Sequence, residues 1–245
     1  MKKKKKVRKR IRWKVILLFV AVILICSSIY FYVSQIPVQR ILIHGTKYTS
    51  DNDIIMATGL KNYPNLMEIH TRDLKQKVLE IPTVEKVNVS KSLFGSVVFD
   101  IEEAKPLFYN RNTGKIAFSN GQESILAQAS GVPTLVNYVP DVYYKRLLNE
   151  LNKLDEDVLR LISEIEYQPW KNGEVIIDET RFFLRMTDGN QVFVNLIHMD
   201  KLNNYMQIYA TLENKKGYLY LDSSSDKISF SLTREEEKEK DVHHE

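Results

Sequence analysis

The sequence has little cysteine. Near its start it also lacks acidic residues and contains a long stretch without any charged residue. Its one cysteine is Cys26, so no disulfide can form within the chain and the fold must be stable through its core alone. Low-complexity sequence occurs only at the two ends. No acidic residue precedes Asp51, and no charged residue of either sign lies in residues 15–36. These absences exclude a disulfide-stapled domain and point to a function organised around an apolar segment.

The uncharged segment 15–36 is long enough to cross a membrane. As a helix its 22 residues span roughly 33 Å, against a bilayer core of about 30 Å. Residues 1–14 hold ten Lys or Arg, and positive charge beside a first apolar segment stays cytoplasmic. The sequence therefore predicts a single-pass anchor with its N-terminus in the cytoplasm and its C-terminal bulk outside. Residues expected to carry this anchor are Val15, Leu18, Phe19, Val22, Ile25 and Ile29.

A cleaved signal peptide is the alternative interpretation of the same segment. Residues 15–26 have the length of its apolar core, and Cys26-Ser27-Ser28 supplies small residues. However, residues 29–33 continue the apolar run where a mature N-terminus should be polar. A lipid-modified Cys26 fits less well, because that site needs a small residue before the cysteine and Ile25 is bulky. An uncleaved anchor is the interpretation kept here.

Charge is distributed unevenly along the chain. The formal net charge is +4, but residues 1–14 alone carry +10, so the remainder, with 25 basic and 31 acidic residues, is near −6. The basic stub suits anionic lipid headgroups, and no nucleic-acid partner is expected. About 210 residues lie beyond the anchor, enough for one large domain or two small ones.

Residues 38–103 predict a strand, two helices and two further strands. The first strand, 38–44, alternates apolar and polar residues and ends at Gly45. A helix begins at the cap Ser50 and stops at Gly59, and a second helix runs from about Thr71 until Pro82 ends it. Two strands follow, at 84–91 and 96–103, joined by a turn at Phe94-Gly95.

At this point the residues resemble a known family. The element order is that of a POTRA module, and its place after a single anchor is similar to the FtsQ/DivIB family of bacterial division proteins. Three passages carry the resemblance: residues 41–45 as an apolar strand closed by glycine, residues 81–89 as P-x-V-x-x-V-x-V, and residues 101–106 as I-x-E-x-x-P. Phe94-Gly95 departs from the proline that the family often has between the last two strands.

The second half predicts a mixed sheet with flanking helices, so the fold class is α+β. Helices are expected from Asp141, after a cap at Asp155 with Val158, Leu161, Ile162 and Ile165 facing inward, and after a cap at Asp200. Strands are expected at 116–118, 124–127, 132–135, 175–178, 182–186, 192–196, 217–222 and 227–232. The expected domains are a basic cytoplasmic stub (1–14), a transmembrane helix (15–36), a POTRA module (37–104), a β domain (105–232) and a charged disordered tail (233–245).

The sequence offers no convincing catalytic or metal-binding set, and no cofactor is expected. The histidines are not spaced as metal ligands; they are His44, His70, His198, His243 and His244. Residues 224–227 match S-x-x-K, in which a lysine can activate a serine, but K-T-G is missing and the motif falls between two strands. Glu102 and Glu103 are adjacent on a strand, so their carboxylates point to opposite faces. We expect no enzyme.

The resemblance implies a non-enzymatic scaffold of the division machinery at the septum. It implies partners that are single-pass division proteins of the FtsL and FtsB/DivIC types, with a septal penicillin-binding protein as a further candidate. They would be held by strand addition at the far end of the second domain. Carried onto this sequence, the partner strand lies near Gly217, Tyr218, Leu219, Tyr220 and Leu221. Tyr218 and Tyr220 alternate on one face and suit an interface, although core aromatics explain them equally well. Whether 217–222 or 227–232 is the free edge stays open.

Two rival functions are distinguishable. A POTRA protein of a translocation system normally continues into a membrane barrel, which the remaining residues do not fit. A membrane-anchored cell-wall enzyme would need a catalytic set, and activity of the purified protein on peptidoglycan would revive that interpretation.

Overall fold

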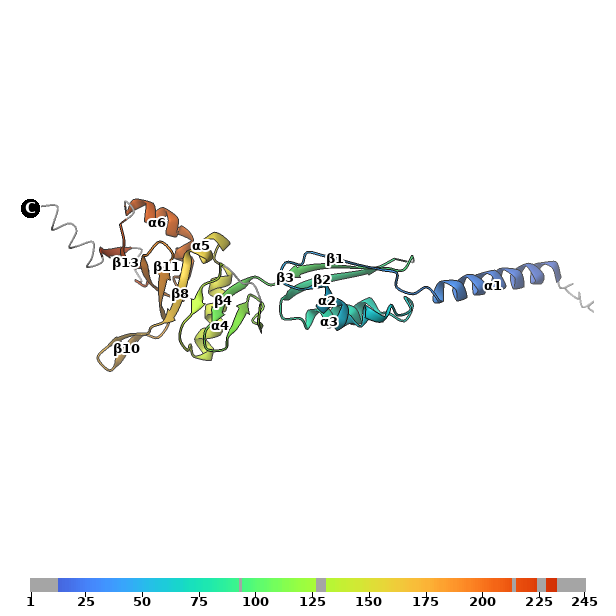
Figure 1. The fold of residues 1–245 in the computed structure, drawn as a ribbon, viewed down its shortest axis with the longest axis horizontal. Helices are drawn as coiled ribbons and strands as arrows, with labels where there is room; N and C mark the ends of the chain where they lie inside the picture. The colour runs from blue at the N-terminus through green and yellow to red at the C-terminus, as the bar shows by residue number, and fades with distance from the viewer. Residues whose placement is uncertain (1–12, 93, 127–130, 213–214, 224–227, 233–245) are drawn as a thin grey trace, which may run out of the picture. The chain divides into compact units, whose positions relative to one another are not determined.

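A computed structural model describes residues 13–92, 94–126, 131–212, 215–223 and 228–232. The chain divides into two compact units (Figure 1). The first comprises 1–46, 50–80 and 87–101, and the second 47–49, 81–86 and 102–245. Residues 47–49, 81–86 and 102–104, which belong to the predicted POTRA module (37–104), are therefore grouped with the second unit.

The first unit contains three α-helices and most of a three-stranded sheet. Helix α1 spans Trp13–Ser34. The sheet has the order β1-β3-β2, and two helices lie along one of its faces (Figure 1). The remaining bounds are β1 Arg40–His44, α2 Asp51–Thr58, a 3-10 turn η1 Leu60–Asn62, α3 Thr71–Leu79, β2 Val84–Lys91 and β3 Ser96–Glu103. The predicted order of strand, helix, helix, strand and strand is confirmed, with η1 as an addition.

Local chemistry explains these elements. The Ser50 side chain accepts the N–H of Asn52 at 3.2 Å and begins α2. Gly59, at φ +76°, ends α2 by donating its N–H to the last carbonyls of the helix. In β3, Val97 and Phe99 alternate with exposed or half-buried residues and are fully buried, as a sheet packed on one face requires.

The second unit is built on a nine-stranded mixed sheet of order β14-β13-β12-β11-β8-β7-β4-β5-β6. A separate two-stranded sheet pairs β9 with β10. The strands of the second unit are β4 Pro106–Asn110, β5 Lys115–Phe118, β6 Glu123–Ser124, β7 Thr134–Leu135, β8 Ile162–Tyr167, β9 Trp170–Asn172, β10 Val175–Asp178, β11 Arg181–Met186, β12 Gln191–Asn195, β13 Gly217–Tyr220 and β14 Ser229–Leu232. Its helices are α4 Asp141–Asn152, α5 Glu156–Leu161, η2 Met199–Asn204 and α6 Tyr205–Thr211.

One hydrophobic core joins this sheet to its helices. Leu147 and Leu151 of α4, Phe182 and Leu184 of β11 and Leu219 of β13 belong to the same buried cluster. The predicted hairpin of β11 and β12 is confirmed, with Phe182 opposite Val194 in the antiparallel register. The α+β class is likewise confirmed.

Two predictions in this half need correction. Ile162 and Ile165 are buried as expected, but they lie on strand β8, because the helix capped at Asp155 ends at Leu161. Their β-branched side chains suit a central strand that pairs with β7 and β11. Asp200 does not cap a helix, since it lies inside η2.

Strand β4 is an element that the sequence pattern does not indicate. It begins at Pro106, and proline is tolerated at the first residue of a strand. Adjacent Leu107 and Phe108 are both fully buried, so the strand lacks the period-two pattern of a half-exposed strand.

Candidate partner-binding edge

Strand β13, the predicted partner strand, has neighbours on both sides. It pairs in parallel with β12 and antiparallel with β14, whose Ser231 lies opposite Tyr218. Within the described residues β14 is the outermost strand of the sheet at this end. A partner strand can therefore add to β14 directly, whereas adding to β13 requires β14 to move away.

The backbone of β14 has one side turned to β13 and the other turned away from the sheet. Leu221 donates its N–H to the carbonyl of Phe193 in β12 at 2.7 Å, so alternate residues of β13, including Tyr218, direct their backbone groups toward β14. Ser231, opposite Tyr218, must then face β13. The N–H and C=O of Phe230 and Leu232 consequently face the open side, where an added strand would bind.

Gly217 allows β14 to lie close to β13. A Cβ atom at this position would lie 2.2 Å from the carbonyl oxygen of Ser231 and 2.7 Å from the Phe230 ring. Any other residue would therefore push β14 away. The Gly217 N–H is also bound, donating to the Asn190 side chain at 2.9 Å.

The other predicted interface residues divide between the two faces of the sheet. Leu219 and Leu221 are buried in the core. Tyr218 and Tyr220 are half-buried on the opposite face and stack on Phe193, with ring centroids 6.2 and 5.2 Å from it. Only the tyrosines thus have side chains that a partner could contact on this strand.

A polar network fixes the end of β13. Arg181 pairs with Asp222 at 2.8 Å and lies 4.0 Å above the ring of Phe193. Asn195 donates to the Asp222 carbonyl at 3.2 Å and to the carboxylate of Asp178 at 3.1 Å. Although burial opposes ionisation, hydrogen bonds from Thr180 and Asn195 and the charge of Arg181 lower the pKa of Asp178. The end of β13 is thereby tied to β11 and β12.

The second glutamate of the I-x-E-x-x-P passage organises a loop. Glu103 accepts the backbone N–H groups of Lys47, Tyr48 and Thr49 at 2.7–3.0 Å. Its carboxylate thus satisfies three donors, and Thr49 further bonds to the hydroxyl of Thr83 at 2.6 Å. The residue is structural, and the sequence indicated it only through the family motif.

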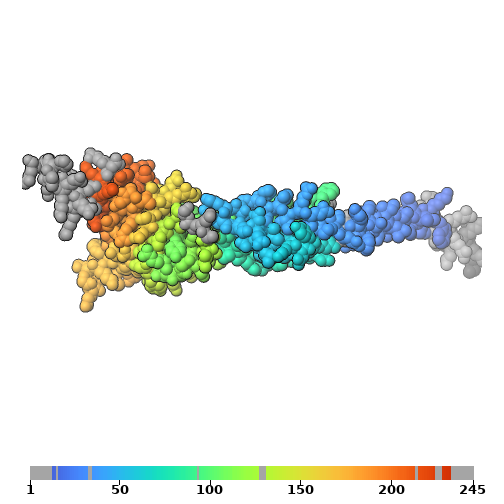
Figure 2. Space-filling view, viewed as in Figure 1, coloured from blue at the N-terminus to red at the C-terminus, as the bar shows by residue number. Residues whose placement is uncertain are grey.

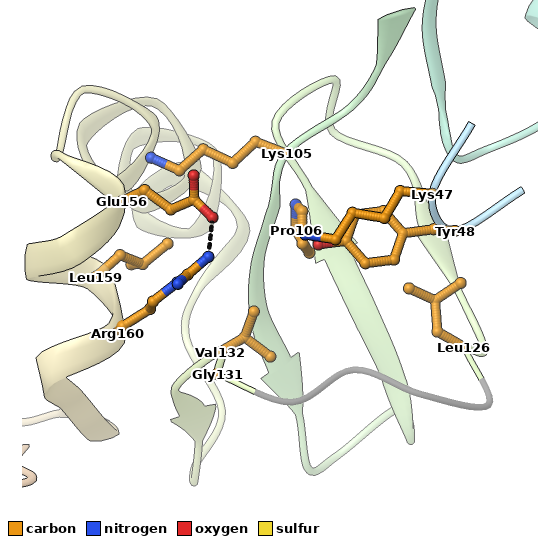
Figure 3. Close-up of a pocket in the computed structure, with 10 residues that line it drawn as sticks. All are labelled: Lys47, Tyr48, Lys105, Pro106, Leu126, Gly131, Val132, Glu156, Leu159 and Arg160. Carbon is orange, nitrogen blue, oxygen red and sulfur yellow. Dashed lines mark hydrogen bonds and ion pairs between the residues drawn. The ribbon is translucent and has the colours of Figure 1, made fainter. Parts of the chain in front are cut away.

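A cavity of about 620 Å³ opens beside this loop (Figure 3). Its basic and acidic side chains come from Lys47, Lys105, Glu156 and Arg160, and Glu156 pairs with Arg160. Lys105 donates to the carbonyl of Leu154 at 2.6 Å, and burial lowers its pKa. None of the lining residues that the structure describes is a serine, cysteine or histidine. The remaining lining residues are Tyr48, Pro106, Leu126, Gly131, Val132 and Leu159.

The other sequence candidates give no chemical site in the described chain. No group of three His, Cys, Asp or Glu residues suited to a metal ion occurs among the residues described. The S-x-x-K match at 224–227, the tail histidines and the predicted disordered tail lie outside those residues.

The predicted anchor residues lie on α1. Leu18, Phe19, Val22, Ile25 and Ile29 are all exposed, and the side chain of Val15 is outside the described part. Of the helices within the described residues, none meets the combined requirement of length and apolarity for crossing a membrane.

Comparison with known protein families identifies the class of the domain in the first half of the chain. Residues 36–104 match the family model of the POTRA domain, FtsQ-type. This range contains the sheet β1-β3-β2 with α2 and α3, so the chain carries a POTRA domain of that type.

Relatives of known name then give the particular resemblance. The chain is 26% identical over 233 residues to the cell division protein DivIB of Listeria monocytogenes, covering 91% of this chain and 84% of that one. It is 24% identical to DivIB of Geobacillus kaustophilus (87% and 83% covered) and 26% identical to DivIB of Bacillus subtilis (90% and 83%). The resemblance to the FtsQ/DivIB family is confirmed.

One solved structure is also similar. It is the major extracytoplasmic domain of the trans isomer of the cell division protein DivIB from Geobacillus stearothermophilus, 26% identical, covering 46% of this chain and 96% of that one with a TM-score of 0.37.

Proposed function

We propose that this chain is a non-enzymatic scaffold of the bacterial division machinery. It captures single-pass division proteins of the FtsL and FtsB/DivIC types by adding their strand to β14, and so links them to septal wall synthesis, with a septal penicillin-binding protein as a further partner. The observation that carries the proposal is that β14 is the outermost strand of the sheet within the described residues; its register with β13 implies that the backbone groups of Phe230 and Leu232 face outward. The similarity to proteins named for cell division supplies the context.

The proposed location is outside the cytoplasmic membrane, with α1 as an uncleaved anchor. Support comes from the uncharged segment 15–36, the exposed apolar side chains of α1 and the ten basic residues within residues 1–14. Protease treatment of intact cells should degrade a C-terminal epitope and leave an N-terminal one. A mature protein starting near Ser27, or a C-terminal epitope protected in intact protoplasts, would contradict this placement.

A pair of variants at one position tests the edge. Leu232→Pro removes an outward N–H, while its matched control Leu232→Ala shortens the side chain and keeps that N–H. The full-length chain, purified in detergent, should lose its single-pass division partners with proline and keep them with alanine. Circular dichroism should show both variants folded, because the Ser231 pairing to β13 is intact.

The outcome discriminates between edges. A folded Leu232→Pro chain that captures partners normally would overturn strand addition at β14. Proline at Leu219 or Tyr220, which would also test the predicted strand, is expected to damage the fold, since Leu219 is a core residue and Tyr220 pairs with β14.

A further inference from the structure

The second unit has a two-stranded hairpin that is separate from its nine-stranded sheet. Strands β9 and β10 form a two-stranded sheet that continues the pairing of β8 with β11 beyond the nine-stranded sheet. Figure 1 shows β10 at the tip of a projecting hairpin, and Figure 2 shows the same segment, in light orange, standing out from the surface. We call residues 170–178 the hairpin arm.

The hairpin arm exposes four large apolar side chains within nine residues. Trp170, Val175, Ile176 and Ile177 are 49%, 67%, 46% and 49% exposed. Neighbouring residues of a strand point to opposite faces, so the arm is apolar on both faces and cannot hide them by folding down one way. Soluble domains rarely keep such a cluster exposed unless it binds something, and an isolated two-stranded hairpin is marginally stable by itself.

The base of the arm is held firmly. The carboxylate of Asp178 accepts both the N–H and the hydroxyl of Thr180 at 2.7 Å. The guanidinium of Arg181 lies 5.9 Å from the ring of Trp170, and Gln168 donates its N–H to the Arg181 carbonyl at 3.2 Å. The apolar tip is therefore presented on a fixed base, which lowers the entropy cost of binding.

The arm is a poor acceptor for an added strand. Strand β9 has three residues, and the register of β10 shifts between Ile176 and Asp178. A bulge and a short edge both discourage main-chain pairing. Binding must therefore use the side chains.

Charge restricts the partner further. The hairpin arm contains one basic residue, Lys171, and two acidic ones, Glu174 and Asp178, and the acidic Glu179 adjoins its base. A second copy of the arm would bring like charges together, whereas a partner with basic residues is attracted. An amphipathic helix offers a continuous apolar stripe beside such charges.

We infer that the hairpin arm docks on the apolar stripe of a partner helix flanked by Lys or Arg. This contact is separate from the β14 edge, but it serves the same partner assembly and so rests on the proposed function.

The test uses the full-length chain with substitutions V175S and I177S together. Because both side chains are exposed, the melting temperature should be unchanged, while co-purified division partner should fall at least fivefold. Val142→Ser, at a 70% exposed position on α4, is the matched control and should change neither quantity. Glu174→Lys should also weaken capture, and more so at low salt.

A photo-crosslinking residue at Ile176 identifies the occupant. We expect adducts to a helical partner segment rich in Lys and Arg, mapped by mass spectrometry. Adducts to lipid, to a second copy or to a partner strand would overturn the inference, as would normal capture or a large fall in melting temperature with V175S and I177S. If the serine variant captures normally while Leu232→Pro does not, only the arm is excluded; if both capture normally, the proposed function fails.

Discussion

The two edges of the nine-stranded sheet are built differently. At one edge, β6 is two residues long and its Glu123 accepts the hydroxyl of Tyr144, whose ring lies edge-on to Phe108 at 5.7 Å. At the other edge, β14 is four residues long and exposes Ser229 and Ser231. Short, charged and side-chain-tied strands resist further pairing, whereas a longer strand with small polar side chains permits it. Of the two edges that the described residues form, the β14 edge is therefore the one to which our proposal assigns another chain.

A substitution in the middle of the sheet, which supports both edges, should have the largest effect on stability. Leu184 is fully buried in the middle of the sheet, so Leu184→Ala should lower the free energy of unfolding by about 3 kcal/mol. Urea denaturation followed by circular dichroism measures it. A loss confined to one edge in hydrogen exchange would show that the sheet is not a single cooperative unit.

Gly217→Ala should affect the β14 edge alone. The added methyl collides with the Ser231 carbonyl and the Phe230 ring, an overpacking worth about 2 kcal/mol, and β14 should separate from β13. Partner capture should be lost while Tyr144 and the β6 edge stay protected in hydrogen exchange. Normal protection of residues 229–232 in this variant would contradict the close approach described here.

Tyr144→Phe is the corresponding change at the β6 edge. Burial, followed by the hydrogen bond to Glu123, raises the pKa of Tyr144, so its hydroxyl remains a donor at neutral pH. Losing it should cost about 1 kcal/mol of stability and leave partner capture unchanged. If this variant captured partners less well, in an assay run alongside Gly217→Ala, the proposed difference between the two edges would be wrong.

Lowering the pH should weaken the polar network at the end of β13. The loss of stability should be smaller than with the substitutions above. Because the pKa of Asp178 is lower in the folded state than its ordinary 3.8, its carboxylate stabilises the fold above that pH, and the contribution is lost as pH falls through the folded value. Asp178→Asn should reduce the dependence of melting temperature on pH below about 4. An unchanged acid profile would remove Asp178 from the groups that hold this end of the sheet.

Sequence patterns predicted the elements whose signals are local. The cap at Ser50, the stop at Gly59 and the alternation in Val97 and Phe99 all reappear in the structure. The assignment of Ile162 and Ile165 to a helix was wrong, because their i, i+3 spacing fits a helix while pairing with β11 holds them in a strand. Strand β4 was missed, since consecutive buried residues show no alternation.

The sequence by itself determined the uncharged segment, the basic stub, the POTRA order and the absence of any disulfide, because each follows from residue type and short-range spacing. Only the tertiary structure decided that β13 is enclosed and β14 is outermost among the described strands, that Leu219 belongs to the core while Tyr218 stacks on Phe193, and that residues 170–178 form a sheet of their own. Strand order and burial depend on contacts between segments far apart in the chain, and no local pattern specifies them.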